Sequence, residues 1–148
     1  MTASKLLPNM QEFNEITAVI LSQLYKSFPV GQNINIDEVG KVLGLANRQQ
    51  QMPSGRSFNE VFHSTLDWLI NEEFVRNLGH LSSERVVLRT KAIAVMNIVP
   101  PSLSQPLGSQ LADATERAST ESGKRKISEL MGNFLGSFIG SFTKTIAH

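Results

Sequence analysis

The segment 57–99 constrains the fold more than any other part of the chain. Ser57 and Glu60 have the spacing of a capping box at a helix N-terminus. Apolar residues then recur every three or four positions as far as Phe74. This pattern predicts an amphipathic helix over residues 57–73, with one wide face directed toward a core.

A β-hairpin and a short helix are predicted to follow that helix. Residues 75–78 and 85–88 are two short apolar runs, and Gly79 lies in the connection between them. Residues 90–99 carry apolar side chains at helical spacing. The order of helix, hairpin and helix therefore predicts a mostly helical α+β domain.

The N-terminal part predicts a long helix over residues 10–27. Asn9 and Glu12 have the spacing of a capping box before it. The helix is expected to stop just before Pro29, because the residue preceding a proline is pushed out of the α region.

A shorter helix is predicted after a loop that contains a possible short strand at 30–36. Asp37 is a suitable N-cap for this helix, and Gly44 can close it in the left-handed conformation. Residues 46–56 are polar and contain proline and glycine, so they predict a loop that is long for a tight helix-turn-helix.

This order of elements resembles the winged-helix (winged helix-turn-helix) superfamily over residues 10–99. The phrase VVLRTKAIAVMN resembles the end of such domains, where the last strand of the wing enters a helix capped by a threonine, here Thr90. The resemblance implies a winged helix with a short β-hairpin wing, followed here by a helical tail. It implies no single function, because winged helices bind DNA, bind proteins or act as spacers.

Composition predicts three parts along the chain. Residues 1–99 are expected to form the domain that resembles a winged helix, and 100–106 are expected to form a linker rich in proline and serine. Residues 107–148 form a helical tail. Its first part, 108–122, is poor in large apolar residues, and Gly123 is expected to interrupt the helix.

The tail has a second distinctive pattern, because Gly132, Gly136 and Gly140 recur every four residues beside an apolar stripe. A glycine costs a helix about 1 kcal/mol relative to alanine. Regular glycines of this glycine-zipper type allow two helices to approach closely. The candidate self-association or partner face comprises Ile127, Leu130, Met131, Gly132, Phe134, Gly136, Phe138, Gly140 and Phe142.

Three interpretations of the tail remain open. The stripe packs on the protein's own core or on a second copy, it docks on a different protein, or it lies on a membrane surface. In the third case Lys124, Arg125 and Lys126 would lie at the lipid headgroups.

The predicted third helix argues against DNA as the main partner. It contains four carboxylates and no lysine or arginine, whereas phosphate neutralisation by these cations supplies most non-specific affinity. The net charge of the chain is only +1. The candidate nucleic-acid contacts of the alternative interpretation are Arg48, Arg56, Ser64, Asn71, Arg76, Arg85 and Arg89.

No catalytic, metal-binding or cofactor-binding pattern is found. The chain has no cysteine and three histidines. His63 and Asp67 are four residues apart on the predicted helix, and we interpret them as a surface pair because no third ligand is placed. The first ten residues lack the apolar core of a signal peptide. A cytoplasmic non-enzyme without cofactors is expected.

The sequence thus predicts a small interaction or assembly module. It is expected to form a homo-oligomer or to bind a protein partner through its C-terminal helix. The alternative is a DNA-binding transcriptional regulator that dimerises through the tail, and the third candidate is a factor that associates with a membrane surface.

Overall fold

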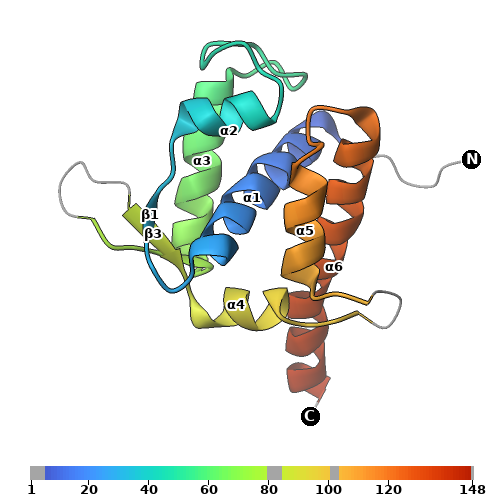
Figure 1. Cartoon of the computed structure of the whole chain (residues 1–148). Coiled ribbons are helices and arrows are strands. Elements are labelled where there is room, and N and C mark those ends of the chain that lie inside the picture. Colours follow the sequence, from blue (N-terminus) through green and yellow to red (C-terminus); the bar gives the residue numbers. More distant parts are fainter. Residues whose placement is uncertain (1–5, 80–84, 101–103, 148) are drawn as a thin grey trace, which may run out of the picture.

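The computed structural model describes residues 6–79, 85–100 and 104–147, with side chains described as far as Phe138. The described residues form a mostly helical α+β fold, as predicted (Figure 1). Its elements in chain order are α1 (Pro8–Ser27), β1 (Gln32–Asn33), α2 (Ile36–Val42), α3 (Phe58–Asn71), β2 (Val75–Asn77), β3 (Arg85–Leu88), α4 (Thr90–Met96), α5 (Leu107–Thr115) and α6 (Glu121–Ala147).

The three strands form one small antiparallel sheet in the order β1-β3-β2. The hairpin of β2 and β3 is confirmed, and the possible strand in the loop after α1 is confirmed as β1. Val86 and Leu88 are buried, and Val75 pairs with Leu88 on the same side. Alternation along a strand therefore gives the sheet one core face and one outer face.

The long first helix ends at Ser27, as predicted, but its predicted capping box is wrong. Pro8 begins the helix, and Leu7 at the cap position makes no side-chain hydrogen bond. Proline suits this position because the missing N–H would have no partner inside the helix. The carboxylate of Glu12 accepts hydrogen bonds from the backbone N–H and the hydroxyl of Ser54, both at 2.7 Å.

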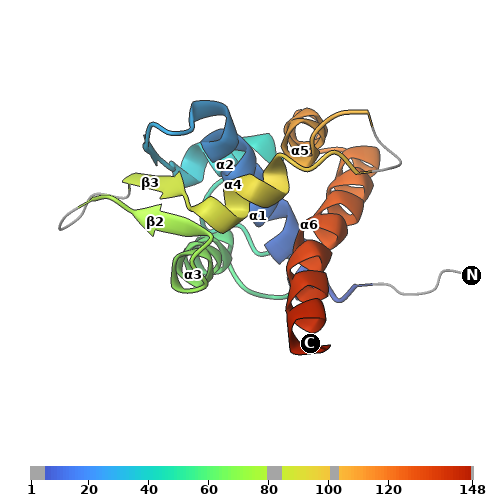
Figure 2. The ribbon, with the colours of Figure 1, turned by 90° about the horizontal axis from the view of Figure 1, so that it is seen from below.

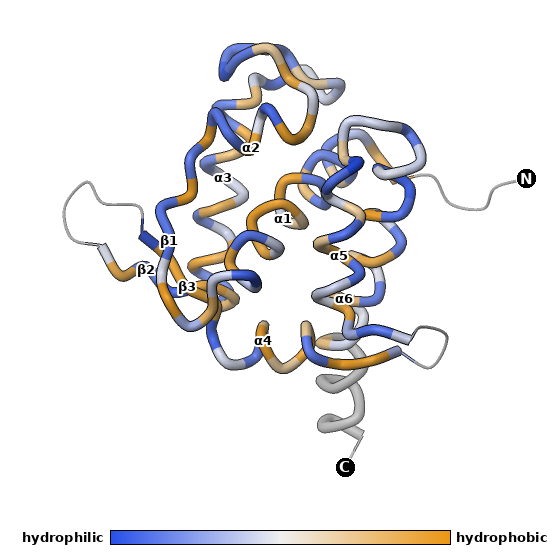
Figure 3. The backbone as a smooth tube through the Cα atoms, in the orientation of Figure 1, coloured by the Kyte–Doolittle hydropathy of each residue, from blue (hydrophilic) through white to orange (hydrophobic). Residues whose placement is uncertain are grey.

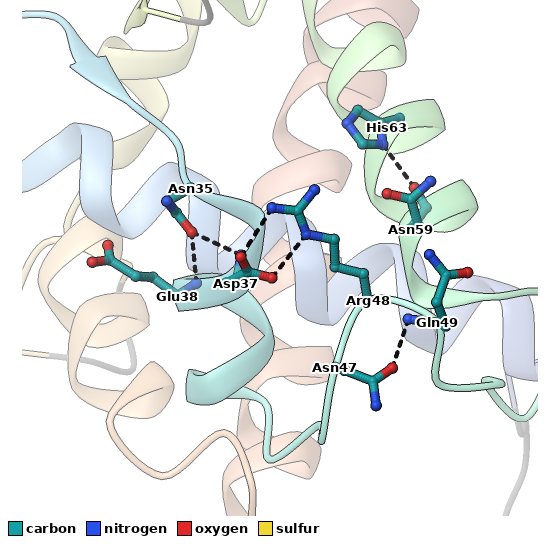
Figure 4. Close-up of polar contacts among 8 residues, drawn as sticks. All are labelled: Asn35, Asp37, Glu38, Asn47, Arg48, Gln49, Asn59 and His63. Atoms are coloured by element: carbon teal, nitrogen blue, oxygen red, sulfur yellow. Dashed lines mark hydrogen bonds and ion pairs between the residues drawn. The ribbon is translucent and has the colours of Figure 1, made fainter.

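The cap predicted for α2 is also wrong. The side-chain oxygen of Asn35 accepts hydrogen bonds from the backbone N–H groups of Asp37 and Glu38, at 2.8 and 3.1 Å (Figure 4). The carboxylate of Asp37 accepts two hydrogen bonds from Arg48, each 2.9 Å long, which hold the pKa of Asp37 below its ordinary value. Gly44 has a φ of +82°, so the predicted left-handed closure is confirmed.

Of the capping box predicted for α3, the bond made by the serine side chain is confirmed and the bond made by the glutamate side chain is not. The hydroxyl of Ser57 accepts a hydrogen bond of 3.2 Å from the backbone N–H of Glu60. The carboxylate of Glu60 contacts the guanidinium of Arg56 instead of the backbone of Ser57. Thr90 is the first residue of α4 and not its cap, since Arg89 holds that position without a side-chain bond.

Helix α1 lies in the middle of the fold, with α2, α3 and the sheet on one side and α5 and α6 on the other (Figures 1 and 2). Apolar positions recur along its length (Figure 3), and Ile16, Ile20 and Leu21 are fully buried. Buried residues from α1 to α6 belong to one continuous hydrophobic core. The linker predicted at 100–106 therefore connects elements that share this core.

The break between the last two helices lies before the glycine that was expected to cause it. Helix α5 ends at Thr115 and α6 begins at Glu121, so Gly123 lies inside the first turn of α6. The hydroxyl of Thr120 accepts a hydrogen bond of 3.0 Å from the N–H of Gly123. A Cβ at Gly123 would overlap the carbonyl oxygen of Arg117. The glycine permits a close approach of backbone instead of ending a helix.

A polar contact also joins the start of α6 to α1. The ammonium of Lys124 donates a hydrogen bond of 2.8 Å to the carbonyl oxygen of Ala118 and lies 3.4 Å from the carboxylate of Glu15. Burial raises the pKa of Glu15, and Lys124 acts in the opposite direction. Lys124 is therefore engaged within the fold, which removes one of the three cations that the membrane interpretation assigned to headgroups.

Candidate interaction surfaces

The first half of the apolar stripe on α6 lies inside the protein. Ile127, Leu130, Met131 and Phe134 are at most 1% exposed and belong to the common core. These four residues were predicted as part of a face for a second copy or a partner. That assignment is corrected for them, because α1 and α5 already cover their side chains.

Five aromatic side chains continue this packing across the molecule. The ring of Phe74 lies 5.7 Å from Phe134 and 4.9 Å from Phe138, and it stacks on Trp68 at 5.6 Å. Phe13 meets Trp68 edge to face at 5.1 Å. This aromatic cluster joins α1, α3 and α6, so it fixes the position of α6 on the rest of the fold.

The glycines of α6 are on the outside of the helix within the described part. Gly132 and Gly136 are exposed, and a Cβ at either position would meet no heavy atom within 4 Å. Their spacing therefore serves no close packing among the described side chains. Gly140 and Phe142 of the predicted face lie beyond the described side chains. The last turns of α6 extend past the other elements (Figures 1 and 2).

The outward face of α3 is acidic and polar, as the sequence predicted. Phe58, Phe62 and Leu69 are buried on its inner side. The exposed side carries the acidic residues and the two polar candidates for base contact: Glu60, Ser64, Asp67 and Asn71. No lysine or arginine lies on this helix to offset its carboxylates.

The five candidate arginines separate into two groups. Arg48 is bonded to Asp37 (Figure 4), and Arg56 lies 2.8 Å from Glu60. Both pairs are exposed, and such pairs contribute little to stability. Their guanidinium groups are nevertheless already bound to carboxylates of this chain, which argues against the prediction that they contact the phosphates of a nucleic acid.

The other three arginines lie on the outer face of the sheet or directly beside it. Arg85 alternates with the buried residues of β3, and Arg76 pairs with Val87 on the same side. Arg89 follows β3 directly as the extended N-cap residue of α4. All three are exposed, and no carboxylate among the described residues forms an ion pair with them. We call Arg76, Arg85 and Arg89 the arginine face.

A groove of about 550 Å³ lies between the start of α1, α3, the loop before α3 and α6. The sequence alone does not predict this groove, because its walls come from four separate segments. The only local signal was Trp68 at the edge of the apolar face of α3. The groove is lined by Asn9, Met10, Glu12, Phe13, Ser54, Arg56, Glu60, Val61, Ser64, Thr65, Trp68 and Leu135.

The histidine on α3 has a local partner. The Nδ1 atom of His63 lies 2.8 Å from the carbonyl oxygen of Asn59, one turn earlier (Figure 4). Within the residues that the structure describes, no three His, Asp or Glu side chains are grouped to hold a metal ion. No described helix is both long and apolar enough to cross a membrane.

The fold and these surfaces define a mostly helical α+β protein with a small three-stranded antiparallel sheet. Comparison of the chain with protein-family models, with curated proteins and with solved structures found no match. The surfaces of the described residues are therefore the basis for inferring a function.

Proposed function

We propose that this protein is a small non-enzymatic assembly module on a winged-helix scaffold, and that two or more copies associate through α6. The winged-helix assignment is supported by the order of α1, β1, α2, α3 and the hairpin. It is also supported by the position of β3 between β1 and β2 in the sheet. Helices α5 and α6 are then an addition that covers α1.

The observation that carries the proposal is the open surface at Gly132 and Gly136. Each glycine weakens an exposed helix by about 1 kcal/mol relative to alanine, and neither makes room for a neighbour among the described residues. A second copy would use this room, because its helix backbone could come close to α6. The end of α6 that extends past the fold lengthens the available surface.

The proposal predicts that Gly136→Leu lowers the oligomeric state of the full-length protein. The larger side chain would hold a second helix away without disturbing the core, since the position is exposed and has no neighbour within 4 Å. Molar mass from light scattering after gel filtration is the measurement. The matched control is Asp113→Leu, which places the same side chain at an exposed site on α5.

The wild type and Asp113→Leu should share one mass above that of a single chain, and Gly136→Leu should shift toward the single chain. Circular dichroism checks that all three proteins remain helical. A wild type that is a single chain at every concentration would contradict the proposal, as would an unchanged mass for Gly136→Leu.

The arginine face supports DNA binding as a second candidate function. Each of Arg76, Arg85 and Arg89 can neutralise one phosphate, but the acidic outer face of α3 opposes its entry into a groove. We expect the full-length protein to bind duplex DNA no more tightly than non-specific proteins do, with Kd no lower than about 10⁻⁴ to 10⁻⁶ M at physiological salt.

Fluorescence anisotropy at several salt concentrations measures this binding. Arg85→Ala should reduce the slope of log K against log salt by about one, whereas Arg48→Ala, which breaks an existing ion pair, should change it less. Selection from a random duplex library tests the contrary case. Enrichment of a palindromic site that is lost on changing Ser64 or Asn71 would make this protein a sequence-specific regulator.

A further inference from the structure

We propose that the groove between α1, α3 and α6 binds a compact organic cation that has an aromatic or aliphatic body. This function is separate from self-association and does not depend on it. The groove is the place where exposed aromatic surface and buried negative charge meet in the described part of the molecule.

The size and walls of the groove fit a small organic molecule. Its volume of about 550 Å³ lies within the range of about 300–1,000 Å³ typical of small-molecule sites. Met10 and Trp68 are each 39% exposed although they are large and apolar. Val61 and Leu135 add aliphatic surface to the walls. A ligand with an apolar body would remove this surface from water.

The aromatic wall is held in place before any ligand arrives. Trp68 stacks on Phe74 at 5.6 Å, and its ring meets Phe13 at an angle of 89°. An indole that its neighbours hold on two sides loses little conformational freedom when a ligand binds.

The charge of the groove selects the ligand. Glu12 is only 3% exposed, and its two hydrogen bonds come from neutral groups of Ser54. No described cation forms an ion pair with it. Glu60 adds a second carboxylate at the rim, where Arg56 balances it. The lining groups therefore carry one uncompensated negative charge beside an apolar wall, where attraction to a cation is stronger than in water.

A ligand that satisfies both features has a positive group near Glu12 and an apolar body along Phe13 and Trp68. Anions of the same shape would meet the carboxylate in a site of reduced dielectric constant and bind poorly. Neutral molecules would gain the apolar contact alone.

Three compounds of matched shape separate these contributions: 4-phenylbutylammonium, 4-phenylbutanol and 4-phenylbutyrate. The chain has a single tryptophan, and this is Trp68 in the wall of the groove. Its fluorescence therefore reports occupancy of this site in the full-length protein without a label. We expect the cation to bind about fivefold or more tightly than the alcohol, which corresponds to about 1 kcal/mol of charge attraction, and the anion to bind weakest.

The Glu12→Gln variant tests the source of this preference. Glutamine has nearly the same shape and can still accept a hydrogen bond from Ser54, so the apolar walls should persist. The variant should bind the cation and the alcohol equally well, with affinity for the alcohol unchanged. Glu38→Gln is the matched control, because it removes a carboxylate from an exposed site on α2 that does not line the groove.

A second variant, at a different residue of the groove, keeps the proposal testable if the first variant does not fold. If thermal melts show that Glu12→Gln does not fold, Glu60→Gln at the exposed rim replaces it. Removing Glu60 leaves Arg56 unpaired beside the groove, so affinity for the cation should fall while affinity for the alcohol stays constant. The proposal is overturned if the three compounds bind equally or if none changes the fluorescence at millimolar concentration. It is also overturned if the folded carboxylate variants keep the preference for the cation.

Discussion

Replacing Phe134 with alanine is expected to lower the free energy of unfolding by about 3–5 kcal/mol. The side chain is fully buried and lies 5.7 Å from Phe74 and 5.1 Å from Phe138, ring to ring. Its removal would leave a cavity between α6 and the elements it covers. The total free energy of unfolding of a small domain is about 5–15 kcal/mol. This single change would therefore remove a large share of the stability.

Chemical denaturation followed by circular dichroism measures the effect. Phe28→Ala is the matched control, because it removes the same side chain from a position that is 42% exposed. The control should cost much less than the core variant. An equal decrease in the free energy of unfolding for the two variants would show that α6 does not pack on the core as described. The apolar stripe of α6 would then again be a candidate interaction surface.

The second large effect is expected at Gly123, where alanine should destabilise the protein by about 1–3 kcal/mol through overpacking. The sign is the opposite of what helix propensity predicts, because alanine is the better helix former. The reason is steric, since the added Cβ would overlap the carbonyl oxygen of Arg117 and the backbone would have to move.

Gly132→Ala on the same helix is the control for this prediction. Its Cβ would meet nothing within 4 Å in the single chain. At protein concentrations low enough to keep the chains separate, the variant should therefore be more stable than the wild type by about 0.5–1 kcal/mol. Thermal and chemical unfolding of the two variants measure the difference. Shifts of the same sign would contradict the different roles that the structure assigns to these glycines.

Local signals along the chain predicted most of the elements. Pro29 ended α1 because proline restricts the residue before it, and Gly44 closed the segment after α2 with a left-handed φ. Ser57 capped α3 through a bond to a residue three positions away. Each signal acts between residues that are close together in the chain, so a short stretch of sequence is enough to recognise it.

The predicted caps failed where a side chain had a distant partner. The carboxylate of Glu12 bonds to Ser54, which is 42 residues away. Asp37 pairs with Arg48 and leaves the capping of α2 to Asn35. Spacing within a helix cannot distinguish a carboxylate that caps from one that meets another segment.

The sequence by itself determined the α+β class, the helices, the hairpin and the acidic outer face of α3, because periodicity and short-range hydrogen bonds set these features. Only the tertiary structure decided that the first half of the α6 stripe is core and that Gly132 and Gly136 face outward. The groove is likewise tertiary, since Glu12, Trp68 and Leu135 come together only after α6 packs on α1. An apolar stripe specifies that a face must be covered, but the shape of the assembled core determines what covers it.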